Sequence, residues 1–149
     1  MTGICKRADG ALASVAAMSE TTPVASPAMA TIAMVTIDCA DATELATFYS
    51  QLLGMTIAYQ DDNVAMLTGE SGPALGFGKV DHYSAPPWPD EKSEKQFHLD
   101  LKVADIAEAE AACVQLGATR PEHQPGGDRW RVMLDPAGHP FCLYLDPGS

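Results

Sequence analysis

The pattern of hydrophobic and polar positions becomes regular from residue 31 onward. Residues 31–37 are β-branched and apolar, which predicts a strand. Asp41 then precedes Glu44 by three positions, the spacing of a capping box at a helix N-terminus. Apolar residues follow at helical spacing, namely Leu45, Phe48, Tyr49 and Leu52. Because Gly54 can end the helix, the pattern predicts a strand followed by one amphipathic helix.

Three more short strands are predicted at residues 55–60, 64–68 and 74–80. The segments between them are rich in Asp, Asn, Gly and Ser, which favour turns. Residues 82–92 contain Pro86, Pro87 and Pro89, so this stretch neither continues a helix nor enters the middle of a sheet. We therefore predict a loop that closes the first half of the chain.

The same order of elements then returns. A strand is predicted at residues 96–103, a helix at 106–116, and further strands at 118–120, 129–134 and 141–146. Asp105 and Glu108 repeat the capping box, and Asp105 lies 64 positions after Asp41. The same offset relates Ala40 to Ala104, Glu44 to Glu108, Gln51 to Gln115 and Leu52 to Leu116. The chain thus contains an internal repeat of one βαβββ module, at about 31–80 and 95–147, and the fold class is α+β.

Composition narrows the functional classes. The chain has 149 residues, 20 acidic against 9 basic, and a net charge of -11. This charge disfavours nucleic acid and anionic membrane surfaces as partners, and no run approaches the roughly 18 apolar residues of a membrane span. The four cysteines form no CxxC pair, so we expect reduced thiols and a cytoplasmic location. A cationic small molecule is compatible with the acidity.

Residues 1–30 differ from the rest. They are rich in Ala, Ser, Thr and Pro, and their few charges cancel. We predict a flexible N-terminal extension at 1–30 and a single folded domain at 31–149. The whole net charge therefore belongs to the folded domain, which makes an acidic pocket or rim a hypothesis to examine.

Four motifs in order resemble the glyoxalase / bleomycin-resistance / dioxygenase superfamily, also called vicinal oxygen chelate. They are residues 37–41 with Phe48-Tyr49 and Leu52-Leu53-Gly54, then 98–101, then 116–118, then 135–143. The likeness covers about 31–147 and is nearest to the glyoxalase-like domain of actinobacterial type. It implies two βαβββ modules that form one open, curved mixed sheet around a cup, with the helices outside. It also implies a homodimer, because members of the family commonly dimerise.

The family's metal enzymes place four ligands, usually His, Gln or Glu, on strands that line the cup. Carried over by position, these fall at Met34, Gly76, His98 and Cys142. Three of the four are not the usual donors, and one imidazole does not hold a divalent ion. We therefore expect no metal and no cofactor, and metal-dependent glyoxalase or dioxygenase activity is disfavoured. If the resemblance holds, Met34, His98 and Cys142 face one pocket, either as soft-metal donors or as pocket wall.

His98 and Asp100 are the candidate catalytic residues. Strand alternation places both on one face, with Leu99 and Leu101 opposite. They can act as a general acid–base pair, or simply satisfy each other inside the cup. A Cys142–His98 nucleophilic pair needs a third group that orients the imidazole, and the sequence shows none.

The remaining pocket candidates are aromatic. Trp88 lies in the proline-rich loop, where a large ring on a stiff segment can cover a ligand. Trp130 lies between Arg129 and Arg131, so alternation sends both arginines to the face opposite the ring. The arginines either bind a carboxylate or phosphate, or they are solvated or ion-paired while Trp130 joins the core. Phe77 is a pocket or core aromatic, and core is favoured.

Three functions follow from these observations. The first is a metal-free protein that binds and sequesters a small molecule in the cup. The second is a lyase, isomerase or dioxygenase-type enzyme that acts through His98 and Asp100 or an atypical metal site. The third is an accessory dimeric module with a degenerate pocket. The sequence favours the first and does not identify the ligand.

Overall fold

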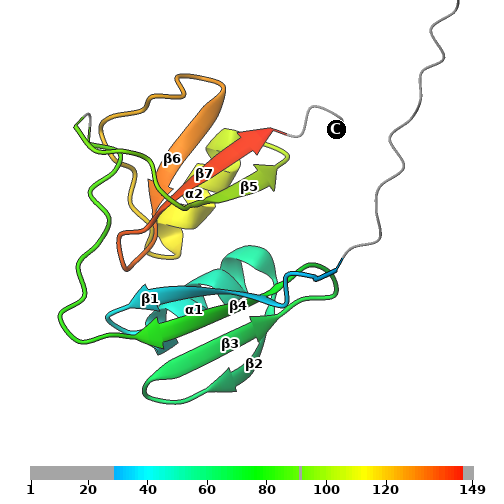
Figure 1. Ribbon diagram of the computed structural model, residues 1–149. Coiled ribbons are helices and arrows are strands. Elements are labelled where there is room, and N and C mark those ends of the chain that lie inside the picture. Colours follow the sequence, from blue (N-terminus) through cyan, green and yellow to red (C-terminus); the bar gives the residue numbers. More distant parts are fainter. Residues whose placement is uncertain (1–28, 91, 146–149) are drawn as a thin grey trace, which may run out of the picture. The chain divides into compact units, whose positions relative to one another are not determined.

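The computed structural model of the protein describes residues 29–90 and 92–145 (Figure 1). The chain divides into two units, Met1–Ala30 and Thr31–Ser149. The predicted flexible extension therefore lies almost wholly outside the described residues. All helices and strands reported below belong to the second unit.

The first module has the element order β1 (Met34–Cys39), α1 (Ala42–Leu53), β2 (Thr56–Gln60), β3 (Val64–Thr68) and β4 (Ala74–Lys79). Its strands form one sheet in the order β1-β4-β3-β2. β1 runs parallel to β4, and the other neighbours are antiparallel. A parallel pair needs a crossover connection, and α1 lies within the segment that returns the chain to β4.

The second module repeats the plan with β5 (Leu99–Val103), α2 (Ile106–Gln115), β6 (Trp130–Leu134) and β7 (Pro140–Leu145). Its sheet has the order β5-β7-β6, with β5 parallel to β7 (Figure 1). The strand predicted at 118–120 is reduced to an isolated bridge between Thr119 and Leu134. Pro121 follows directly and has no N–H for a ladder, so pairing stops there.

Asp41 and Asp105 cap the two helices at the predicted positions. The Asp41 carboxylate accepts a hydrogen bond from the Glu44 N–H at 2.9 Å, and Asp105 accepts one from Glu108 at 2.8 Å. Gly54 follows α1 with φ 67°, a left-handed conformation that favours glycine. Local sequence therefore sets the start of both helices and the end of the first.

A shared aromatic cluster forms the core. Tyr49 of α1 stacks on Phe77 of β4 with ring centroids 5.5 Å apart, and Phe48 lies 6.0 Å from Phe141 of β7. Phe77 is 1% exposed, so it is a core residue, as the sequence favoured. Residues of both modules thus bury one hydrophobic cluster, although neither module is large enough to expect a stable core by itself.

The α+β class with two βαβββ-type modules is confirmed. Within the described residues, however, the strands form two sheets, where the sequence analysis expected one continuous curved sheet. Each sheet packs one face against the core and leaves the other uncovered by its own helix. We call these uncovered faces the first outer face, which carries Met34, Thr36 and Gly76, and the second outer face, which carries Asp100, Cys142 and Trp130.

Candidate functional site

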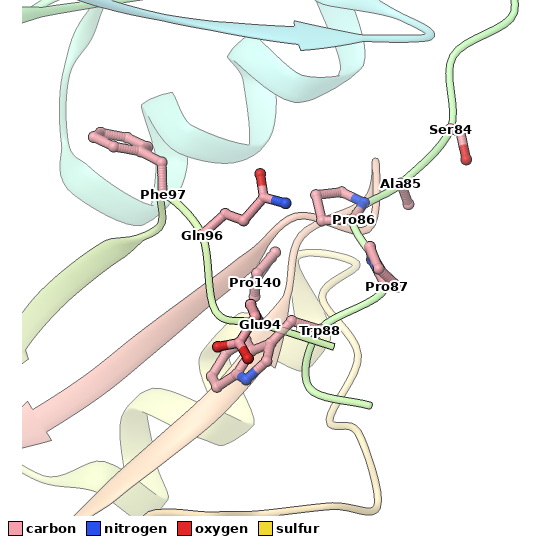
Figure 2. Close-up of a pocket in the computed structure, with 9 residues that line it drawn as sticks. All are labelled: Ser84, Ala85, Pro86, Pro87, Trp88, Glu94, Gln96, Phe97 and Pro140. Carbon is pink, nitrogen blue, oxygen red and sulfur yellow. The ribbon is translucent and has the colours of Figure 1, made fainter. Parts of the chain in front are cut away.

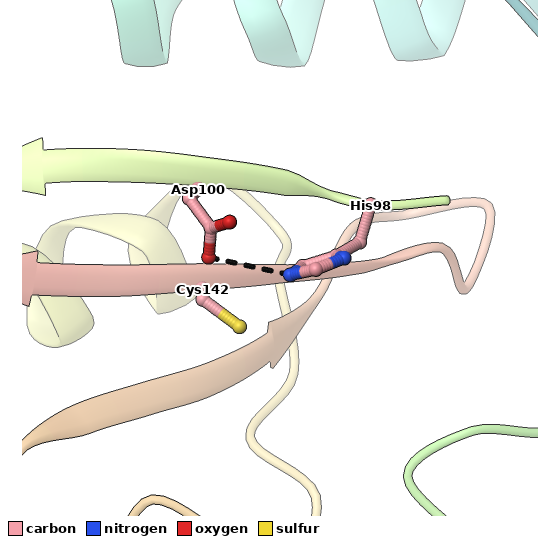
Figure 3. A group of neighbouring side chains, drawn as sticks. All are labelled: His98, Asp100 and Cys142. Carbon is pink, nitrogen blue, oxygen red and sulfur yellow. Dashed lines mark hydrogen bonds and ion pairs between the residues drawn. The ribbon is translucent and has the colours of Figure 1, made fainter. Parts of the chain in front are cut away.

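His98, Asp100 and Cys142 meet on the second outer face (Figure 3). Asp100 lies on β5 directly opposite Cys142 on the parallel strand β7, and His98 immediately precedes β5. Because side chains alternate along a strand, His98 and Asp100 share one face, as predicted. The sheet register therefore brings together residues that are more than forty positions apart.

The three side chains form one polar group. His98 Nε2 lies 3.2 Å from Asp100 Oδ1, and one donor atom from each of the three residues lies within 4.8 Å of the others. The His98 side chain is 12% exposed and that of Asp100 is 57% exposed, while Cys142 is buried. The imidazole is thus held at the edge of the sheet, with the carboxylate open to solvent.

Cys142 remains a thiol at neutral pH. Burial and, as a smaller cause, the negative charge of Asp100 together raise its pKa to about 11, against an opposing effect of Lys95. A thiol rather than a thiolate is a poor nucleophile. The arrangement therefore does not provide a cysteine nucleophile activated by His98.

A cavity of about 490 Å³ opens beside Asp100 and Cys142 on the second outer face. Its other lining residues are Lys95, Arg129, Trp130, Tyr144 and Leu145. Trp130 therefore lies in the pocket wall and not in the core.

Arg131 points to the other face, where its Nε lies 2.7 Å from Glu110 Oε2, while Arg129 lines the cavity. The two arginines separate because Arg129 precedes the first residue of β6, so the alternation predicted for a strand does not extend to it.

Trp88 also lies near Lys95. The Lys95 ammonium is 5.6 Å from the Trp88 ring centroid and 5.5 Å from that of Trp130. Trp88 also lines a cavity of about 380 Å³ in the proline-rich loop, together with Gln96, Phe97 and Pro140 (Figure 2). The position of Lys95 between the rings of Trp88 and Trp130 was not visible in the sequence, where Lys95 is one of several charged residues in a loop.

The structure does not bring Met34 and Gly76 to this group. They line a separate cavity of about 280 Å³ on the first outer face, with Thr36, Tyr59 and Val64. In this chain Met34 thus lies on the first outer face, and His98 and Cys142 lie on the second. The physical reason is that the two sheets are separate, so each module presents its own outer face.

The family's four-ligand metal set does not fit these residues. A Cβ at Gly76 would come within 3.0 Å of Met34 Sδ and 3.1 Å of Thr36 Oγ1, so the first module has little room for a ligand side chain. Among the described residues, the metal-ligating side chains that cluster are the three of the second module. Imidazole, carboxylate and sulfur suit a thiophilic ion, but that ion would have to displace the thiol proton. We derive no step through a metal.

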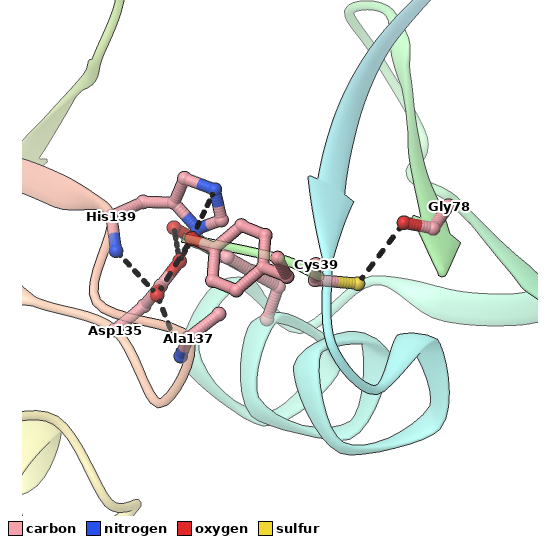
Figure 4. Close-up of polar contacts among 7 residues, drawn as sticks. Cys39, Gly78, Asp135, Ala137 and His139 are labelled. Carbon is pink, nitrogen blue, oxygen red and sulfur yellow. Dashed lines mark hydrogen bonds and ion pairs between the residues drawn. The ribbon is translucent and has the colours of Figure 1, made fainter. Parts of the chain in front are cut away.

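A second polar network lies at the turn between β6 and β7 (Figure 4). Asp135 is 3% exposed, and its carboxylate accepts hydrogen bonds from the N–H groups of Ala137 and His139, both at 2.9 Å. The Tyr49 hydroxyl of α1 donates to the same carboxylate at 3.0 Å, and the His139 ring lies between Asp135 and the Tyr83 hydroxyl. Asp135 thereby ties the turn of the second module to the helix of the first.

The fold and the outer-face residues together define the class: a protein built from paired βαβββ modules, with candidate site residues on the exposed strand faces. A family model described as "Glyoxalase-like domain" matches residues 34–144. The chain belongs to this family, and the superfamily resemblance drawn from the sequence is confirmed.

Solved structures show the same fold at low identity. A glyoxalase-related enzyme from Fulvimarina pelagi is 19% identical, with 78% of this chain and 88% of that chain covered and a TM-score of 0.55. A glyoxalase/bleomycin resistance protein/dioxygenase family enzyme from Burkholderia phytofirmans PsJN is also 19% identical, with 78% and 98% covered and a TM-score of 0.57. A lactoylglutathione lyase from Agrobacterium tumefaciens is 18% identical, with 80% and 96% covered and a TM-score of 0.51. No curated protein matches the chain. At these identities, the likeness establishes the fold alone.

No helix among the described residues has the length and apolar character needed to cross a membrane.

Proposed function

We propose that the protein binds a small molecule in the 490 Å³ cavity of the second outer face, without the four-ligand metal site of its family. The observation that supports this is the polar group of His98, Asp100 and Cys142 beside that cavity, on a rigid pair of strands. Concave sites with a few convergent polar groups are the usual form of ligand pockets. The cavity is large enough for a small organic molecule.

A thermal-shift screen against a broad compound library tests this proposal. A ligand at 100 times its dissociation constant should stabilise the protein by about 2.7 kcal/mol. The affinity should change in Asp100→Asn, because Asp100 lines the cavity, and should stay the same in Thr36→Val, because Thr36 occupies on β1 the position that Asp100 occupies on β5. Absence of any stabilising compound overturns the proposal. So does binding that is lost in Thr36→Val and has the same affinity in Asp100→Asn as in the native protein.

Elemental analysis of protein purified without added metal tests the metal-free part separately. We expect less than about 0.1 ion per chain, since a catalytic site for a divalent ion normally has three deprotonated ligands. A near-stoichiometric ion that is lost in Cys142→Ser would contradict it. Cys113→Ser is the matched control, because Cys113 is a buried free cysteine on α2.

A second candidate function uses the same residues for proton transfer. It is favoured by the 3.2 Å contact between His98 Nε2 and Asp100 Oδ1, which can orient an imidazole as a general base. A ligand found in the screen should then exchange a C–H proton, or be consumed, when incubated with the protein in D₂O and followed by NMR. His98→Gln should abolish this while leaving the melting temperature unchanged. If the ligand stays intact and exchanges no proton, the proton-transfer function is contradicted and only the binding function remains.

We also propose a cytoplasmic homodimer. The three cysteines among the described residues are free and buried, as expected of a protein with reduced thiols. The first outer face exposes Met34 at 46%, Tyr59 at 51% and Val64 at 43%, and none of the described residues that line its cavity is charged. Two copies that each carry a net charge of -11 repel each other least at a face without charge. A second copy is therefore the proposed partner of this face.

A further inference from the structure

We infer that the ligand of the second outer face is a small organic anion, whose carboxylate, sulfonate or phosphate group is received by Lys95 and Arg129. This inference rests on the proposed binding function and names its ligand class. The net charge had suggested a cationic ligand. The residues that line the cavity favour the opposite charge.

The distribution of charge around the cavity is the first argument. The chain has more than twice as many acidic as basic residues, 20 against 9, yet the described residues that line this cavity include two cations and one carboxylate. Arg120 and Arg131 are both paired with Glu110 on the helix side of the sheet. Neither Lys95 nor Arg129 forms an ion pair with another described residue. Within the part of the chain that the structure describes, the two cavity cations therefore have no ion-pair partner.

Asp100, the one carboxylate among the described residues of the cavity lining, is already engaged. Asp100 Oδ1 contacts His98 Nε2 at 3.2 Å, and the Cys142 sulfur lies within 4.8 Å of the same group. A cationic ligand would have to share this carboxylate and approach Lys95 and Arg129 at the same time. An anionic ligand meets two cations and avoids an acceptor that is already used. The local balance thus favours an anion, although the whole protein is acidic.

The position of Lys95 is the second argument. Its ammonium lies 5.6 Å from the Trp88 ring centroid and 5.5 Å from the Trp130 ring centroid, within the range of cation–π attraction. The face of an aromatic ring attracts the cation without supplying a carboxylate or carbonyl acceptor. The rings therefore hold the ammonium near one position while its N–H groups remain available to a ligand.

Trp130 is itself fixed by backbone packing. A Cβ on Gly126 would come within 2.3 Å of the Trp130 ring, so the ring lies directly against a glycine that is buried. Holding Lys95 in place before binding reduces the side-chain entropy that a ligand would otherwise have to offset. The apolar atoms of Trp130, Tyr144 and Leu145 around the cavity favour an organic anion over an inorganic one.

Three probes of one shape and different charge test the inference: 4-fluorobenzoate, 4-fluorobenzylammonium and the neutral 4-fluorobenzyl alcohol. Fluorine NMR detects each probe. The chain has two tryptophans, and both flank Lys95, so their indole N–H signals report binding at the site. A ligand of about ten heavy atoms at roughly 0.3 kcal/mol per atom binds with a dissociation constant in the millimolar range. We expect 4-fluorobenzoate to bind below about 10 mM and 4-fluorobenzylammonium to bind at least tenfold more weakly.

Lys95→Met and Arg129→Met should each weaken 4-fluorobenzoate about tenfold, as loss of a charge-assisted hydrogen bond does. Lys79→Met is the control, since it removes the same charge from the end of β4 in the first module. Methionine keeps an aliphatic stem of similar length, and the melting temperature of each variant verifies folding.

Two outcomes overturn the inference and leave the proposed function intact. One is preferential binding of 4-fluorobenzylammonium, especially if Lys95→Met strengthens it, because the two tryptophans would then form a cation site that Lys95 fills in the free protein. The other is failure of 4-fluorobenzoate to bind at about 10 mM while library compounds or the neutral alcohol bind at the same indole signals. If no library compound and no probe binds, both the inference and the proposed function are contradicted.

Discussion

The two outer faces can be compared position by position, because both modules follow the same order of strand and helix. The first face has a cavity of about 280 Å³ whose lining carries no charged residue. The second has a cavity of about 490 Å³ whose lining includes a carboxylate, a thiol, a lysine and an arginine. One backbone plan therefore supports an apolar surface in one copy and a polar cavity in the other.

The difference lies in side chains at matching register positions. Thr36 is opposite Gly76 in the β1–β4 pair, and Asp100 is opposite Cys142 in the β5–β7 pair. Met34 and His98, which lie two residues before Thr36 and Asp100, complete the comparison. The sheet supplies the geometry in both modules, and the side chains decide which module has a candidate site. Fold similarity to other members of the family therefore does not identify the ligand.

The largest expected effect concerns the turn between β6 and β7, which is hydrogen-bonded to the buried carboxylate of Asp135. The matching turn of the first module has no carboxylate at this position. Asp135 lies three residues before Gly138, and the residue three before Gly72 is Gly69. Asp135→Ala removes the acceptor for the N–H groups of Ala137 and His139 and for the Tyr49 hydroxyl. We expect the free energy of unfolding to fall by about 4 kcal/mol in urea denaturation.

Tyr49→Phe provides the smaller, matched change. It removes one of these hydrogen bonds and keeps the ring that stacks on Phe77, so the loss should be about 1 kcal/mol. An equal loss in the two variants would show that the turn hydrogen bonds of Asp135 contribute little, and that the second module is not locked in this way.

Two glycines with similar backbone conformation give the next comparison. Gly72 has φ 82° and Gly138 has φ 87°, so alanine is strained at both, by about 1–2 kcal/mol. A Cβ at Gly72 meets nothing within 4 Å, whereas one at Gly138 lies 2.7 Å from the Ala85 side chain. Gly138→Ala should therefore cost about 1–3 kcal/mol more than Gly72→Ala in the same denaturation experiment. Equal costs would mean that the loop carrying Ala85 moves aside freely.

The local parts of this fold could be predicted from the sequence. The repeat of Asp41 and Asp105 sets both helix starts, and the glycines and prolines mark the turns and the long loop. His98 and Asp100 were placed on one face by alternation alone. These features depend on residues close together in the chain, where spacing carries the information.

The remaining features depend on contacts between distant residues. Nothing in the spacing indicates that Tyr49 reaches Asp135 across 86 positions, or that Lys95 lies between two tryptophans. Whether two modules join into one sheet or form two is decided by how their strand edges pair, which a repeat in the sequence leaves undetermined. The separation of the two sheets is also why Met34 lies on a different outer face from His98 and Cys142.

The proposed homodimer gives a prediction about association. Val64→Lys places a charge on the first outer face, whereas Tyr144→Lys places one on the second. Val64→Lys should weaken dimerisation at least tenfold, because a buried unpaired ammonium is costly, and Tyr144→Lys should leave dimerisation unchanged. Light scattering during gel filtration over a range of concentrations measures both. A monomeric native protein, or a dimer broken only by Tyr144→Lys, contradicts the assignment of this face.

The smallest expected difference concerns the cysteines of the two modules. Burial raises the pKa of both Cys39 and Cys142 from 9.0 to about 11. Both thiols are thus protonated in the folded protein over a range in which an unfolded thiol ionises. The raised pKa values contribute fully to the free energy of unfolding below about pH 9. This contribution is lost as the pH rises toward 11, because ionisation of the thiols favours the unfolded chain. Neither thiol should react readily with iodoacetamide at pH 8.

Asp100→Asn separates the two cysteines. The carboxylate charge is the second cause of the raised pKa of Cys142, after burial, while Cys39 responds to Asp41 and Asp135 instead. The variant should therefore lower the pKa of Cys142, but by less than half of the rise, because burial remains as the larger cause. The pKa of Cys39 should stay unchanged. The pH dependence of alkylation at each cysteine, followed by mass spectrometry, measures this. A fall at both cysteines would indicate general loosening of the fold, and no change at Cys142 would mean that its thiol does not sense Asp100.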